Sequence, residues 1–399
     1  MQAFKGSAIV AIAMAVLLIP LICGDGIASQ KARSAKVDVT DLVAQGKSLL
    51  AMRRPQQAWE VFDRVCELRE DLPDGHLGIY MADEIVLVDW LQSLVEFVID
   101  NIDQWFKTKG SQKVAGEIIR ETIEDFARPL LAEMVDHLDR IDEDFSFYLP
   151  EYPLFVYRDR LVCDLGGEWD YSDVLIVRGM ARWLLGLCDF LLSYNLDFDA
   201  GHIIDIELPP DADLREILLT LVDALLDMLN DPDYPDFLYL SDEGFELLPQ
   251  AGIEFGRGNI EVIAGFARVL QETDPQEDDI FAYSDENGNS RWDAGEPLVF
   301  PYIGRISDDQ APFIWSLLRV VELAGESMLD ETEFDTSSEP NPFPLDSINP
   351  LVESFGLPPI LPAMEIDLGE FYRNPKREQL HDTLVLVLTL IKQFLEQMP

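Results

Sequence analysis

Apolar side chains recur every three to four residues along several long stretches of this chain, and no other feature restricts its possible folds as strongly. That spacing places them on one face of an α-helix. In residues 111–141, acids lie opposite an apolar stripe of Ala115, Ile118, Ile119, Ile123, Phe126, Ala127, Leu130, Met134, Leu138 and Ile141. The chain is therefore predicted to be mainly α, with packed helical hairpins or an irregular helical array and small β or irregular insertions.

Other stretches carry the same period. They predict helices at 39–71 (a pair, the second opening at Pro55), 83–106, 173–194, 211–229, 259–271, 312–328 and 376–397. Pro129 is expected to kink the 111–141 helix, because proline lacks the backbone N–H of the helical ladder. Between 146 and 170 the helical period gives way to short β-like runs with prolines between them, and 231–236 is typical of a turn.

Length and composition favour several units with ample cores. The chain has 399 residues, of which 48% are hydrophobic, enough for two or three domains. We expect a signal peptide at 1–28, an N-terminal helical domain at 37–145 and a central helical domain at 146–329. An acidic, Pro- and Ser-rich linker at 330–349 is expected before a C-terminal helical segment at 350–399.

Acidic residues outnumber basic ones by 75 to 29, a formal net charge of −46. Such a field repels nucleic acid and anionic lipid headgroups, so neither is an expected partner. It favours cations as ligands, and a basic protein is a candidate partner. A solvated acidic surface without a specific ligand would give the same composition.

The N-terminus has the pattern of an export signal. Lys5 precedes an apolar run from Ala8 to Ile22, and Gly26-Ile-Ala28 offers a cleavage site. The run is shorter than the about 20 apolar residues of a membrane span. An extracytoplasmic location, periplasmic or extracellular, is predicted, with a retained N-terminal anchor as the alternative. Cys23 resembles the lipidated cysteine of bacterial lipoproteins, although Ile22 stands where that family has a small residue.

Cysteines and histidines give no predicted site. Cleavage leaves Cys66, Cys163 and Cys188, an odd number that does not form a disulfide framework. Cys163 and Cys188 could pair in an oxidising compartment, or all three could be core residues. The four histidines stand singly, outside any helical zinc or di-iron pattern. No phosphate loop, dinucleotide fingerprint or Gly-x-Ser-x-Gly elbow occurs, and no catalytic residue is predicted.

Residues 39–73 resemble one tetratricopeptide repeat. Gly46, Ala58 and Phe62 stand at the spacing of that motif, while its proline comes late, at Pro73. No second copy follows at a 34-residue period. The resemblance implies two antiparallel helices whose gap Phe62 fills. One such unit cannot bury its own apolar face, so it should pack on the segment that follows. An ordinary helical hairpin is the alternative.

One twelve-residue stretch, 285–296, has oxygen-bearing side chains at its first, third, fifth, ninth and twelfth positions. Calcium takes six to eight oxygen ligands. The stretch resembles the EF-hand loop, and more closely the bacterial calcium loops of dockerin and thrombospondin type. By position, that resemblance implies Ca²⁺ ligands from the side chains of Asp285, Asn287, Asn289 and Asp293, the carbonyl of Arg291 and both carboxylate oxygens of Glu296.

Two features depart from the EF-hand pattern. Ser290 stands where the pattern prefers glycine, and Pro297 disfavours an exiting helix. Because two of the ligands are neutral asparagines, the affinity should suit extracellular calcium at about millimolar level. A turn that binds no ion is the alternative.

Together these features predict an exported, acidic helical scaffold or adaptor with one structural calcium loop, and favour a protein that is not an enzyme. The alternative is a helical-toroid carbohydrate-active enzyme that uses two carboxylates as acid and base. Seven tryptophans and an exported location permit that alternative, but the required carboxylate separation cannot be read from spacing.

Overall fold

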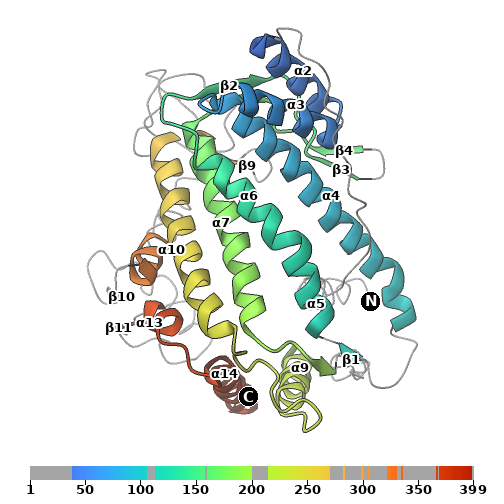
Figure 1. Ribbon diagram of the computed structural model, residues 1–399. Coiled ribbons are helices and arrows are strands. Elements are labelled where there is room, and N and C mark those ends of the chain that lie inside the picture. Colours follow the sequence, from blue (N-terminus) through green and yellow to red (C-terminus); the bar gives the residue numbers. More distant parts are fainter. Residues whose placement is uncertain are drawn as a thin grey trace.

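The mainly α prediction is confirmed. A computed structural model describes residues 38–105, 113–114, 116–157, 160–199, 214–269, 282–283, 298–300, 304–305, 321–329, 334–335, 365–366 and 368–397. Helix accounts for 73% of the described residues and strand for 8%. In Figure 1, α4 (Pro73–Trp105), α6 (Arg128–Leu138), α7 (Tyr171–Ser193) and α10 (Gly244–Val269) lie side by side.

A helical hairpin covers one end of this layer. It consists of α2 (Val39–Ala51), which Asp38 caps by accepting a hydrogen bond from the Thr40 amide, and α3 (Pro55–Leu68), which begins at a proline as predicted. The ring of Phe62 is fully buried and fills the gap. It contacts the backbone of Gly46 on α2 and Gly78 on α4 so closely that a Cβ atom at either glycine would overlap it. The predicted pair of helices is present, and its likeness to a tetratricopeptide repeat stays a prediction.

The 111–141 segment is divided by a π-helical turn. α5 (Gly116–Thr122) is followed by η1 (Ile123–Ala127) and then by α6, in which Pro129 is the second residue. A proline removes one N–H from the ladder and crowds the preceding turn. The wider π turn accommodates this change immediately before Pro129, where the sequence predicts a kink.

Short strands occupy 146–170, as the sequence predicts. β2 (Ser146–Leu149) pairs with β5 (Gly167–Asp170), and β3 (Phe155–Tyr157) pairs with β4 (Arg160–Cys163), both antiparallel. Arg53, in the left-handed region at φ 54°, joins this insertion to the hairpin. Its guanidinium donates to the carbonyls of Pro153 and Leu154 at 2.9 Å each.

The closest helix pair is α7 and α10, where small residues let the two backbones approach. A Cβ at Gly179 would lie 2.6 Å from the carbonyl oxygen of Gly258, and a Cβ at Gly258 would lie 2.7 Å from that of Gly179. The helix predicted at 259–271 begins too late, because α10 begins at Gly244. Pro249 and the glycines of α10 are typical of helix ends, yet they lie within the helix, where Gly258 allows the close packing against α7.

A second helix pair lies at the opposite end from the hairpin. α9 (Leu214–Leu229) packs against α14 (Gln379–Gln397) (Figure 1). The predicted turn at 231–236 follows α9 and is confirmed by the bond from the Tyr234 amide to the Asp231 carbonyl. The short helix α13 (Leu368–Arg373) precedes α14 and contacts α10. A further helix covers 321–329. It overlaps the helix predicted at 312–328 and ends one residue later.

Three small antiparallel sheets complete the described chain, two of them with two strands and one with three. β1 (Lys113–Val114) pairs with β6 (Phe198–Asp199), β7 (Ala282–Tyr283) with β8 (Leu298–Phe300), β8 with β9 (Gly304–Arg305), and β10 (Phe334–Asp335) with β11 (Glu365–Ile366). The main core is one cluster of buried side chains, with members from Leu50 to Leu248. It includes residues on both sides of position 145, where the sequence predicts the boundary between the N-terminal and central domains. Among the described helices, none has the length and apolar character of a membrane span.

Candidate functional site

The predicted calcium ligands, at 285–296, lie outside the described residues, as do the signal peptide at 1–28 and most of the linker at 330–349. The two segments next to the loop are described and are paired. Ala282 lies opposite Val299 and Tyr283 opposite Leu298 in the antiparallel β7–β8 pair. Strands rather than helices therefore flank this loop, which agrees with the expectation that Pro297 disfavours an exiting helix.

The three cysteines in the described part of the chain are unpaired. Cys66 and Cys163 are half-buried, Cys188 is buried, and all three are free thiols. Cys163 lies on β4 and Cys188 on α7. The disulfide considered between these two is absent from the structure, and burial raises the pKa of the Cys188 thiol to about 12.

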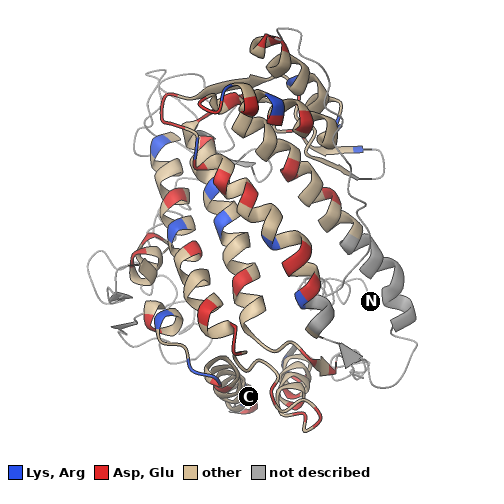
Figure 2. Cartoon of the chain, viewed as in Figure 1, with Lys and Arg blue, Asp and Glu red and all other residues tan. Residues whose placement is uncertain are grey.

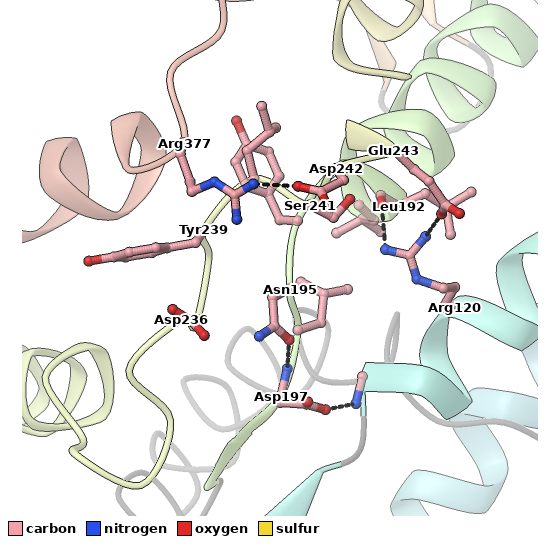
Figure 3. Close-up of a pocket in the computed structure, with 15 residues that line it drawn as sticks. Arg120, Leu192, Asn195, Asp197, Asp236, Tyr239, Ser241, Asp242, Glu243 and Arg377 are labelled. Carbon is pink, nitrogen blue, oxygen red and sulfur yellow. Dashed lines mark hydrogen bonds and ion pairs between the residues drawn. The ribbon is translucent and has the colours of Figure 1, made fainter. Parts of the chain in front are cut away.

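An open pocket of about 540 Å³ lies where α5, the end of α7 and the 236–243 segment meet the residues that precede α14 (Figure 3). Its charged side chains are largely engaged with one another. Arg120 donates to the Leu192 carbonyl at 2.8 Å and pairs with Glu243, and Arg377 pairs with Asp242. Asp197 accepts a hydrogen bond from the amide of Gly116. Three of the four described acids that line the pocket, Asp197, Asp242 and Glu243, therefore have a donor, and the fourth is Asp236.

The same pocket attaches α14 to the rest of the molecule. The amide of Leu240 donates to the Arg377 carbonyl at 2.8 Å, and His381 of α14 lies 3.0 Å from the Leu229 carbonyl through Nε2. The ring of Tyr239 packs edge-on against the His381 ring, with centroids 5.1 Å apart. These contacts make the pocket a polar junction between the α9–α14 pair and the main layer.

α14 has two apolar faces. The inner face, with Leu384, Val385 and Leu388, packs against a core around Met228 and Leu229. The outer face is exposed. We call it the α14 face and define it as Leu386, Val387, Leu390, Ile391 and Phe394, whose exposed fractions run from 40% to 59%. Spacings of one, four, five and eight residues place all five on one side of the helix.

The two helices that carry the α14 face are acidic. Together α9 and α14 contain five Asp or Glu and two Lys or Arg residues. Asp382 pairs with His381, and Lys392 pairs with Asp223 at 2.7 Å and also interacts with Glu396 and Asp227. Arg215 donates to the carbonyls of Leu395 and Glu396 at the end of α14. Figure 2 shows acidic residues, in red, along the long helices of the molecule. The face is thus apolar and lies on a helix pair of net negative charge.

A group of thiol and imidazole side chains, which the sequence did not reveal, lies where α3, α4 and α6 meet. His76 Nδ1 and His137 Nδ1 are 2.9 Å apart, and Cys66 Sγ is 3.7 Å from His76 Nδ1. The histidines are 61 residues apart in sequence, so no local spacing signals their contact. The sequence around His137 offers one related feature, the acidic Glu133 one turn earlier on α6.

A buried acid lies two turns further along α4. The hydroxyl oxygen of Tyr152 is 2.8 Å from both the Met81 carbonyl and Glu84 Oε2, although a hydroxyl has one proton to donate. A protonated Glu84 supplies the second proton. Burial raises the pKa of Glu84 to about 7, against the opposing hydrogen bonds from the hydroxyls of Tyr152 and Tyr80. Burial, with the nearby Glu133, also raises the pKa of Asp83 to about 8.

Comparison with known proteins places this chain in no family: no family model, no curated protein and no solved structure matches it.

Proposed function

We propose that this protein is an exported, acidic helical adaptor that binds a basic, amphipathic helix of a partner protein on the α14 face. The observation that carries the proposal is the row of five exposed apolar side chains on α14, on a helix pair of net negative charge. Contiguous exposed apolar surface with a polar rim is typical of interaction sites.

Charge selects the class of partner. The helix pair and the chain as a whole are negative, with a formal net charge of −46 for the chain, so an approaching basic segment is attracted. A second copy of this chain would bring the same negative charge, and an anionic membrane would be repelled. A helix with Lys or Arg beside an apolar stripe matches both the apolar row and the negative charge of the helices that carry it, as in other helix-in-groove complexes.

The rest of the fold supports an adaptor. The α9–α14 pair is attached to a large, rigidly packed helical layer through the polar junction, so the face is held at one end of a stable body. In this proposal the 285–296 loop binds one Ca²⁺ through the ligands named above and stiffens the hairpin of β7 and β8. The carbohydrate-active alternative needs a free acid pair, and the acids of the pocket are mostly held by donors.

Binding of a defined probe tests the proposal. The probe is a synthetic peptide of lysine and leucine with helical spacing, titrated into the mature protein by calorimetry. A peptide with glutamate in place of lysine is the matched probe control. We expect measurable binding of the lysine peptide only, weakening as salt is added, because screening reduces attraction between exposed charges.

Paired variants locate the site. In the Leu386→Ser and Leu390→Ser double variant we expect the lysine peptide to bind at least 10-fold more weakly, because each lost leucine contact is worth about 1–2 kcal/mol. The matched control is Leu161→Ser with Val162→Ser, which removes two side chains that are 55% and 50% exposed on β4. Equal binding of both peptides, or equal loss in both variants, would refute the proposal. Self-association through the face would refute it as well.

A further inference from the structure

Three side chains from three helices converge on one small volume. Cys66 belongs to α3, His76 to the first turn of α4, and His137 to the last turn of α6. His76 is 2% exposed, and the side chain of His137 is 15% exposed. The imidazole rings lie with their centroids 5.2 Å apart and both Nδ1 atoms facing each other. Thiolate and imidazole are the ligand types that borderline and soft transition metals prefer.

Hydrogen bonding fixes which ring nitrogen of His76 has a free lone pair. Its Nε2 lies 2.9 Å from the carbonyl oxygen of Glu70. A carbonyl only accepts, so Nε2 carries the proton and Nδ1 of the neutral ring presents its lone pair to His137 and Cys66. A hydrogen bond from the distal nitrogen to a carbonyl is the usual support of a metal-binding histidine.

The position of the proton on the His137 ring must be considered in the same way. Its Nε2 lies 3.9 Å from Glu133 Oε1. If the proton of a neutral ring is on Nε2, two Nδ1 lone pairs face each other at 2.9 Å. If the proton is on Nδ1, that nitrogen donates to His76 Nδ1, and the Nε2 lone pair lies on the side of the half-exposed Glu133. A metal ion would take the place of the proton between the two Nδ1 atoms.

Negative charge surrounds this position. The carboxyl of Asp63 interacts with both His137 and Glu133, and the carboxyl of Asp83 interacts with Glu133. Asp83 is 6% exposed, and its Oδ2 is buried without a hydrogen-bond partner. The nearest described cation, Arg140, is paired with Asp136 at 2.9 Å and with Glu70 at 3.5 Å. The surroundings therefore favour a cation at the centre.

We propose that Cys66, His76 and His137 bind one divalent transition metal ion, with Zn²⁺ as the expected ion. Glu133 supports the distal nitrogen of His137, and a water molecule completes a four-coordinate shell. This site is separate from the α14 face and from the 285–296 loop, so it does not depend on the proposed adaptor function.

A modest movement would assemble the shell. As the side chains stand, no three His, Cys, Asp or Glu groups in the described part of the chain could hold a metal ion together. Around a tetrahedral zinc, two ligand nitrogens lie about 3.3 Å apart, and a sulfur and a nitrogen about 3.6 Å apart. The observed separations are 2.9 Å and 3.7 Å. The imidazole–imidazole hydrogen bond must therefore lengthen by a few tenths of an ångström when the ion enters.

Binding through Cys66 is a proton-for-metal exchange. It breaks the S–H bond of the thiol, releases the proton to solvent and forms a sulfur–metal bond.

Cobalt(II) is the probe that tests the site. Chelator-treated mature protein is titrated with Co²⁺ in excess Ca²⁺, which occupies oxygen-rich surface sites. We expect one equivalent of Co²⁺ to give a thiolate-to-cobalt charge-transfer band, and Zn²⁺ to displace it. The band should vanish in Cys66→Ser and persist in the matched control Cys163→Ser. Glu133→Gln should retain the band but weaken affinity by about 10- to 100-fold, because it removes a supporting partner.

The result on the unmodified chain is decisive, because it needs no variant to fold. Absence of a thiolate band in folded protein would overturn the proposal, as would a band that survives in a folded Cys66→Ser variant. In either case the group is a hydrogen-bonded part of the core, with His137 Nδ1–H and the Cys66 thiol donating to His76.

Discussion

At the scale of single residues, the acid Glu84 is expected to make the stability of this protein depend on pH. Glu84 is held near the hydroxyls of Tyr152 and Tyr80, and Trp169 packs edge-on against Tyr152 with ring centroids 6.0 Å apart. Because burial raises the folded-state pKa of Glu84 from 4.5 to about 7, folding favours the protonated form. The stabilisation from this group is complete below pH 4.5 and is lost as pH rises through 7.

The Glu84→Gln variant tests this sign. The amide keeps the shape and the donor of the protonated acid but cannot ionise. Near pH 4 we expect the free energies of unfolding of variant and unmodified protein to agree closely. At pH 8 the variant should be more stable by about 3 kcal/mol, from the size of the pKa change. Urea unfolding at both pH values measures the difference. The exposed Glu60→Gln is the control, and a pH-independent difference for Glu84→Gln would contradict the assignment.

At the scale of elements, an ion-pair network joins α6, α7 and α10. Arg182 on α7 makes two bonds with Asp139 at 2.7 and 2.8 Å, one with Glu254 at 2.9 Å and one with Glu261 at 3.0 Å. Burial alone would lower the pKa of Arg182, but Glu261, Glu254 and Asp139 outweigh it and raise the pKa. The side chain of Arg182 is only 6% exposed.

Removing the arginine takes the cation from the largely buried Glu254 and leaves Asp139 and Glu261 with Arg178 alone, at 3.4 and 3.1 Å. We expect Arg182→Met to lower the free energy of unfolding by about 3–5 kcal/mol, because breaking a buried network costs far more than its formation contributes. Arg64→Met is the matched control. Arg64 is 48% exposed and pairs with Glu67 one turn away, so its loss should cost less than about 1 kcal/mol. Similar losses in the two variants, measured by chemical denaturation, would show that the network does not join the helices.

Helices were predictable where apolar residues repeat along one continuous face. Their bounds were less predictable where contacts with another helix, rather than a local sequence pattern, determine them. α9 and α14 begin within three residues of their predicted starts, because their stripes are continuous. The start of α10 was missed, since the glycines that contact α7 carry no helical signal of their own. The His76–His137 contact was missed for a related reason. It joins helices that are distant in sequence, and only the packed fold brings them together.

At the scale of the whole molecule, charge determines which ligands the protein meets. A formal charge of −46 disfavours compaction through self-repulsion and attracts cations. Bound calcium would relieve part of that repulsion and, by closing the 285–296 loop, stabilise the folded chain. An ion that binds the folded form alone stabilises it by mass action.

A thermal melt with and without calcium tests the loop. If the dissociation constant is about millimolar, 10 mM Ca²⁺ should add about 1.4 kcal/mol of stability and raise the melting temperature by a few degrees. Equal ionic strength from NaCl separates binding from screening. The rise should disappear in the Asp285→Ala and Glu296→Gln double variant and remain in Asp197→Ala. A melting temperature that does not change with Ca²⁺, or a rise that survives the double variant, would remove the structural role.

Hydrogen–deuterium exchange of the mature protein, with and without the lysine–leucine peptide, tests the adaptor account most directly. The account predicts slower amide exchange along 379–397 and in the adjoining turns of α9 when the peptide is bound, with exchange in α2 and α3 unchanged. Peptide binding that protects another surface, or that leaves α14 exchanging at its original rate, would contradict it.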